Sequence, residues 1–140
     1  MALREFIRED LVLVTPQDAL GAVCRRLEAQ RVGSALVVDE GTLVGILTER
    51  DVVRAMAEGA DGERSSAADY MTRTPMTIED DRSMEEAARV MMTNLIRHLP
   101  VIDRNSQVLG MLSIRDIVRW TVRQGSPDET DPLPRLVDLV

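Results

Sequence analysis

A ten-residue segment occurs twice in this chain, and this repetition limits the fold more than any other feature of the sequence. Residues 45–54 read GILTERDVVR and residues 110–119 read GMLSIRDIVR. Six of the ten aligned pairs are identical (Gly, Leu, Arg, Asp, Val and Arg), and three more keep their chemistry. Self-similarity of this kind predicts two copies of one supersecondary unit.

Each repeat is predicted to run helix, strand, turn, strand, helix, which makes the fold class α/β (α+β). The opening helices show apolar residues at helical spacing, and Ser83 to Glu86 has the spacing of a capping box. β-branched runs on either side of short polar segments predict the strands. We assign residues 6–62 to the first repeat, 67–123 to the second, and 124–140 to an irregular acidic tail. The remaining elements are strands at 35–39, 44–47, 99–103 and 108–112, turns at 40–41 and 104–106, and closing helices at 50–58 and 115–123.

Composition excludes several classes of function. A net charge of −7 and a pI near 4.7 argue against nucleic-acid binding, which needs a basic surface. All 17 basic residues are arginine, so neither a Schiff-base lysine nor a P-loop lysine is present. One cysteine and one histidine cannot form a disulfide, a zinc finger or a multi-histidine metal site within one chain. We therefore expect no catalytic residue, no metal site and no required cofactor, and we interpret Cys24 as a core thiol.

The expected location is the cytoplasm. No apolar run approaches the roughly 20 residues that cross a bilayer. The first ten residues lack the apolar core of a secretory signal and carry acidic residues that transit peptides avoid. We expect no association with a membrane.

The repeated pattern resembles the CBS domain family. The resemblance rests on Gly-apolar-apolar-Thr/Ser-x-x-Asp in both copies, on the Leu99-Pro100-Val101 strand entry and on Tyr70-Met71-Thr72, which is similar to the family's lead-in to a second repeat. It covers about residues 6 to 123, and two copies at this spacing are far more specific than one. The resemblance implies two repeats, each a small sheet with flanking helices, packed about a pseudo-twofold axis with two clefts between them.

The resemblance also implies a ligand and its binding residues. Similar modules bind AMP, ADP, ATP, NAD or S-adenosylmethionine in those clefts, with the Asp on the ribose hydroxyls and the Thr or Ser on ribose or phosphate. Carried over by motif, these residues are Thr48 and Asp51 in one cleft and Ser113 and Asp116 in the other. Arg97 and His98 occupy a place where similar domains often carry basic residues that reach a phosphate, and His98 could equally be a hydrogen-bonded structural residue.

The chemistry of the residues agrees with such a ligand. Thr48 and Ser113 stand where a strand gives way to a helix, so an anion there meets exposed N–H groups and the positive end of the helix dipole. An ionised Asp is a pure acceptor and can take the two hydroxyl donors of a ribose. Aromatic residues are only 2% of the chain, so aliphatic neighbours such as Ile46 and Met111 would have to enclose the base.

Two alternatives stay open at this point. The Thr-x-x-Asp and Ser-x-x-Asp spacings are also those of helix N-caps, and capping and ligand binding can coexist. The leading hypothesis is a stand-alone regulatory module that binds an adenosyl ligand. The alternative is a ligand-free dimerisation or scaffold module that recruits a larger protein. Either would be a homodimer associating through apolar helical faces that include Met91, Met92, Val118 and Trp120, and Trp120 could equally belong to the core. A regulated protein partner is expected but not identified by the sequence.

Overall fold

The computed structural model describes residues 3–124 and divides them into two compact units. The first unit comprises residues 10–75, and the second comprises residues 3–9 together with 76–124. Residues 3–9, which precede the first repeat in the sequence, therefore pack with the second repeat. The expected acidic tail lies outside the described residues, apart from Gln124.

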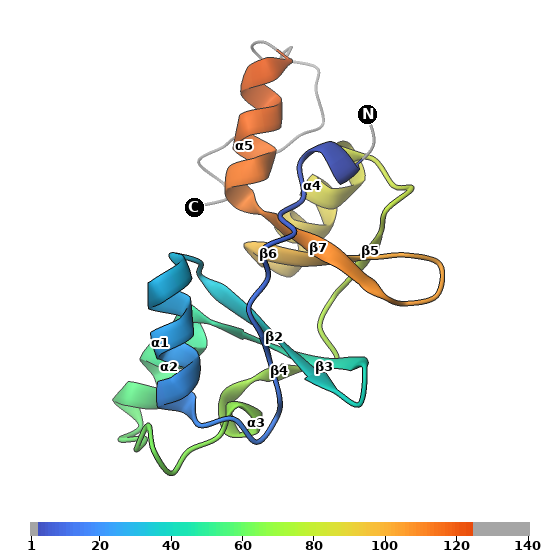
Figure 1. Ribbon diagram of the computed structural model, residues 1–140. Helices are drawn as coiled ribbons and strands as arrows, with labels where there is room; N and C mark the ends of the chain where they lie inside the picture. Colours follow the sequence, from blue (N-terminus) through green and yellow to red (C-terminus); the bar gives the residue numbers. More distant parts are fainter. Residues whose placement is uncertain (1–2, 125–140) are drawn as a thin grey trace. The chain divides into compact units, whose positions relative to one another are not determined.

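The first unit is a four-stranded sheet covered by helices (Figure 1). The strand order is β1-β2-β3-β4, with β1 parallel to β2 and the other neighbours antiparallel. Its apolar core lies between the sheet and the helices and includes Val23, Val37 and Leu47, which are all fully buried. The elements are β1 (Leu13–Val14), α1 (Leu20–Gln30), β2 (Ser34–Asp39), β3 (Thr42–Thr48), α2 (Glu49–Ala57), α3 (Ala67–Tyr70) and β4 (Thr72–Arg73).

The second unit repeats this plan with a three-stranded sheet in the order β5-β6-β7. Its core includes Met91, Leu99 and Leu112 from the repeat itself and Leu3 and Phe6 from the start of the chain. In Figure 1 the N-terminal segment lies in the same unit as α4 and β7. The elements are η1 (Leu3–Glu5), β5 (Ile78–Glu79), α4 (Met84–Asn94), β6 (His98–Ile102), β7 (Val108–Ser113) and α5 (Ile114–Arg123).

The predicted fold class and the predicted helices and strands are confirmed, to within one or two residues at their ends. The turn between β2 and β3 falls on Glu40 and Gly41, which have φ of 49° and 81°, as a tight hairpin turn requires. In the second repeat the Asp103 carboxylate accepts the amides of Asn105 and Gln107 at 2.8 and 3.0 Å and closes the longer turn. Met91 belongs to the second unit's core, so the prediction that it forms part of a dimer surface is wrong. Of the two positions left open for Trp120, the structure confirms the core.

Five short elements were not predicted: η1, β1, β4, β5 and α3. Each has two to four residues, which is too short to show a periodic pattern. β4 exists because Thr72 and Arg73 pair with Ile46 and Gly45 of β3. Arg8 does the same for the second unit, where it exchanges two backbone hydrogen bonds of 3.0 Å with Met111 of β7. In both units the segment that precedes the other repeat completes the sheet.

The repeated glycine explains how these added segments fit. A Cβ on Gly110 would lie 2.6 Å from the carbonyl oxygen of Arg8, which is fixed backbone. A Cβ on Gly45 would lie 2.5 Å from Sδ of Met71, which belongs to a flexible side chain, and 3.1 Å from the Thr72 carbonyl oxygen. The glycine at the head of each motif therefore makes room for a crossing chain.

We expect Gly110→Ala to lower the free energy of unfolding by about 1–3 kcal/mol, because the backbone of Arg8 must move to accommodate the methyl group. Gly45→Ala should cost less, since Met71 can change its rotamer. Urea unfolding of both variants measures the difference. An equal loss of stability in the two variants, or a larger loss for Gly45→Ala, would show that the contact with the Arg8 carbonyl is not the reason for a glycine at position 110.

Candidate functional site

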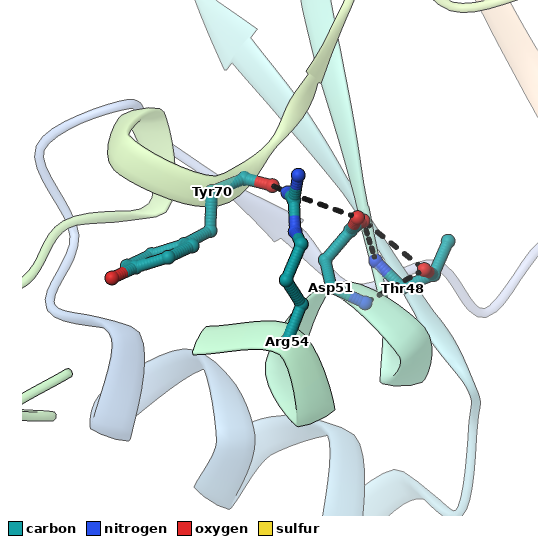
Figure 2. Close-up of polar contacts among 4 residues, drawn as sticks. All are labelled: Thr48, Asp51, Arg54 and Tyr70. Carbon is teal, nitrogen blue, oxygen red and sulfur yellow. Dashed lines mark hydrogen bonds and ion pairs between the residues drawn. The ribbon is translucent and has the colours of Figure 1, made fainter. Parts of the chain in front are cut away.

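The predicted residues Thr48 and Asp51 lie together where β3 runs directly into α2 (Figure 2). Thr48 is the N-cap of α2, with extended backbone, and Asp51 is the third residue of the helix. The backbone N–H of Thr48 donates to Oδ2 of Asp51 at 2.9 Å, and the Thr48 hydroxyl donates to the same oxygen at 3.1 Å. The Asp51 amide donates to Oγ1 of Thr48 at 3.4 Å, which completes a capping box.

Ser113 and Asp116 form the equivalent arrangement between β7 and α5. The Ser113 amide donates to Oδ2 of Asp116 at 2.7 Å and its hydroxyl donates at 3.0 Å. The Asp116 side chain is 2% exposed, compared with 13% for Asp51. The capping interpretation of both motifs is therefore confirmed. A ligand can bind to the same carboxylates only through acceptor positions that the caps leave open.

The two oxygens of each carboxylate have different partners. Oδ2 of Asp51 accepts both hydrogen bonds from Thr48, whereas Oδ1 is approached by the guanidinium of Arg54 at 3.5 Å. A carboxylate has about four acceptor positions. A distance of 3.5 Å is at the outer limit for a hydrogen bond, so Oδ1 of Asp51 keeps most of its accepting capacity. In the second unit Arg119 holds Oδ1 of Asp116 more closely, at 3.2 Å.

Arg54 and Arg119 were not predicted as parts of the site. A signal for them exists, because they are an identical pair in the repeat and each lies three residues after its Asp, on the same helix face. Both side chains are more than half exposed, at 54% and 59%. Arg54 adds a positive charge beside the carboxylate of Asp51, and Arg119 adds one beside the carboxylate of Asp116.

The helix N-termini differ in charge between the repeats. α2 has Glu49 and Asp51 in its first turn, whereas α5 has only Asp116. The first amide of each helix is already used, since Glu49 donates to the Gly33 carbonyl at 3.0 Å and Ile114 donates to the Arg97 carbonyl at 2.9 Å. An anion therefore meets less negative charge at the start of α5.

The other predicted residues lie around these two junctions. His98 is the first residue of β6, half-buried, and stands opposite Ser113 in the strand register. Arg97 precedes it and is exposed. Ile46 and Met111 are buried, at 7% and 6% exposure, on the strands that lead into the junctions. The exposed residues Arg50 and Arg115 follow the N-cap residues by two positions.

The comparisons with known proteins identify the family. The CBS domain model matches residues 3–58 and again 67–123. The chain therefore belongs to the CBS domain family and carries two such domains in tandem. No helix within residues 3–124 is long and apolar enough to cross a membrane.

Similar proteins include one curated relative and two solved structures. An uncharacterised protein of Methanopyrus kandleri is 28% identical over 121 residues, which is 85% of this chain and 62% of that protein's length. A protein with CBS domains from Burkholderia ambifaria has a TM-score of 0.83 at 23% identity, and the match covers 93% of this chain and all of that one, a likeness of fold. A CBS domain protein of Pyrobaculum aerophilum, solved in complex with AMP, has a TM-score of 0.78 at 26% identity over 88% of this chain and 99% of its own.

We predict that Asp116→Ala lowers the stability of the unliganded protein more than Asp51→Ala does. Loss of a cap acceptor costs about 0.5–2 kcal/mol, and the nearly complete burial of Asp116 adds the cost of leaving the Ser113 amide without its partner. Urea unfolding followed by far-UV circular dichroism measures both losses. A larger loss for Asp51→Ala would contradict the difference in burial.

Proposed function

We propose that this chain is a regulatory module that binds an adenosyl ligand and holds its ribose hydroxyls on Asp51 or Asp116. The single observation that carries the proposal is the division of the Asp51 carboxylate: Oδ2 caps the helix while Oδ1 keeps accepting capacity. Capping and binding are therefore compatible on one side chain. The AMP complex of the Pyrobaculum aerophilum relative supports an adenine nucleotide as the ligand class.

The charges around the two junctions suggest different tasks within the proposal. A phosphate group is better placed near the start of α5, where the first turn has a single acid. His98 stands opposite Ser113 in the strand register, the Arg97 carbonyl accepts the Ile114 amide, and Arg115 follows Ser113 by two positions. A ligand without phosphate, such as S-adenosylmethionine, is better tolerated at α2, where Glu49 adds negative charge. Ile46 and Met111 would supply aliphatic surface for the base.

Binding, and not catalysis, is the proposed output. Family members that stand alone are typically regulatory, and the family match covers most of the described chain. A ligand that prefers one conformation of the module shifts its population and thereby its affinity for a partner protein. The cytoplasm remains the proposed location. A scaffold that binds no ligand is the alternative, and the ligand experiments separate the two.

The first test is a thermal-shift screen with AMP, ADP, ATP, NAD and S-adenosylmethionine. At a free concentration of about 100 times Kd, a ligand that binds only the folded state stabilises it by roughly 2.7 kcal/mol. For a domain of this size the melting temperature rises by several degrees. We expect such a rise with at least one of the five compounds. No rise with any of them would favour the scaffold alternative.

The second test separates binding from capping by Asp51→Asn. The amide oxygen can still accept the Thr48 N–H, whereas an NH₂ donor replaces the accepting Oδ1. We expect affinity to fall by about 10- to 150-fold, equivalent to 1.5–3 kcal/mol, with stability nearly unchanged. Glu86→Gln is the matched control, because Glu86 forms a capping box with Ser83 outside the repeated motif. Unchanged affinity of Asp51→Asn for the compound found in the screen would remove Asp51 from the site.

We also propose that the chain forms a homodimer through the outer face of α2. Val53 and Met56 are 68% and 69% exposed and lie three residues apart, on one side of the helix. Such a pair of large apolar side chains is stabilised by burial against a second copy. Analytical ultracentrifugation should show a dimer at micromolar concentration that Val53→Glu with Met56→Glu dissociates. Leu13→Glu, the same kind of change on β1, should leave the dimer intact, and a monomeric wild-type chain would refute the proposal.

A further inference from the structure

Arg54 connects the candidate ligand site to a different part of the first unit (Figure 2). Its guanidinium Nη2 donates to the carbonyl oxygen of Tyr70 at 2.9 Å and lies 3.5 Å from Oδ1 of Asp51. The guanidinium carbon is also 6.0 Å from the centre of the Tyr70 ring, at the outer limit of a cation–π contact. One side chain thus touches both the carboxylate proposed to hold the ligand and the end of α3.

The segment that follows Tyr70 in the first unit is short, and it includes a residue in an unfavourable backbone conformation. β4 consists of two residues, and the unit ends two residues later at Pro75. Thr74 has φ of 48°, which is unfavourable for a β-branched residue and for a residue that precedes proline. The hydrogen bond that its backbone N–H donates to the Val44 carbonyl is 3.3 Å long. Strain of this kind persists only where neighbouring contacts hold the segment in place, so each contact to residues 67–73 matters.

The second repeat divides these roles between two residues. Arg119 contacts Asp116 at 3.2 Å, whereas the ring of Phe6, in the segment that completes this unit's sheet, lies beneath Arg123 at 5.4 Å. Arg123 is in the last turn of α5, one turn beyond Arg119. The contact to Asp116 and the contact to Phe6 are thus made by two different arginines.

We propose that Arg54 is a positioning residue that couples occupancy of Asp51 to the segment at residues 67–73, through which the chain passes to the second unit. This inference rests on the proposed function, because it requires a ligand at Asp51. A ligand hydroxyl that donates to Oδ1 draws on the negative charge that attracts Arg54 at 3.5 Å and weakens that attraction. The guanidinium then binds the Tyr70 carbonyl with less competition, and local opening of α3 and β4 becomes less frequent.

Hydrogen–deuterium exchange of the full chain, with AMP and separately with S-adenosylmethionine, tests this coupling. In the wild type, bound compound should slow exchange of amides in residues 67–73 by roughly two- to fivefold, the size expected for one exposed ionic contact. In Arg54→Met the compound should still slow exchange at residues 48–54 but should no longer change residues 67–73. Arg54→Lys, which keeps the positive charge but replaces the planar guanidinium fork by a compact ammonium, should behave in the same way. Arg119→Met is the control and should retain the wild-type response in residues 67–73.

The outcomes separate this inference from the proposed function. If neither compound changes exchange anywhere in the wild type, both proposals fall. If exchange slows at residues 48–54 but not at 67–73, only the coupling falls. If residues 67–73 respond equally in the wild type and in both Arg54 variants, the contact between Arg54 and Tyr70 is merely structural and the coupling is refuted.

Discussion

The structure of each repeat depends on one hydrogen bond between a helix carboxylate and the last amide of the preceding strand. Asp51 accepts the Thr48 amide at 2.9 Å and Asp116 accepts the Ser113 amide at 2.7 Å. The bond fixes how the helix leaves the sheet, since it joins the N-cap to the third helical residue. It also fixes the position of the second carboxylate oxygen, and with it the place where a ligand hydroxyl or an arginine can bind.

Sequence reasoning predicted the parts of the fold that follow from local patterns. The helices, the hairpins and the glycine-led junctions could be read from periodicity and from the repeat, because each is determined within about 20 residues. The segments that each unit receives from outside its own repeat could not be predicted in this way. β4 and the bridge at Arg8 are set by pairing with strands far along the chain, and two residues show no period. The repeated glycine is visible in the sequence, but the reason for it is visible only in the structure, where the Arg8 carbonyl oxygen would lie 2.6 Å from a Cβ on Gly110.

In the candidate site, too, the contacts between residues near in sequence could be predicted and those between distant residues could not. The Thr-x-x-Asp spacing predicted both a cap and a binding residue, and it could not decide between them. In the structure the cap uses Oδ2 of Asp51, which leaves Oδ1 for the proposed ligand. The main partner of Arg54 is a backbone carbonyl 16 residues away, for which the sequence carries no signal. The spacing of Arg119 from Asp116, in contrast, was readable as a helical i,i+3 pair.

A crystal structure of the chain with AMP tests the central claim most directly, because it locates the ribose relative to each carboxylate oxygen. We expect a ribose hydroxyl within hydrogen-bond distance of Oδ1 of Asp51 or of Asp116, while Oδ2 of the same residue still accepts the amide of its N-cap residue. A ligand bound away from both carboxylates, or a carboxylate that must give up its cap to reach the ribose, would contradict it.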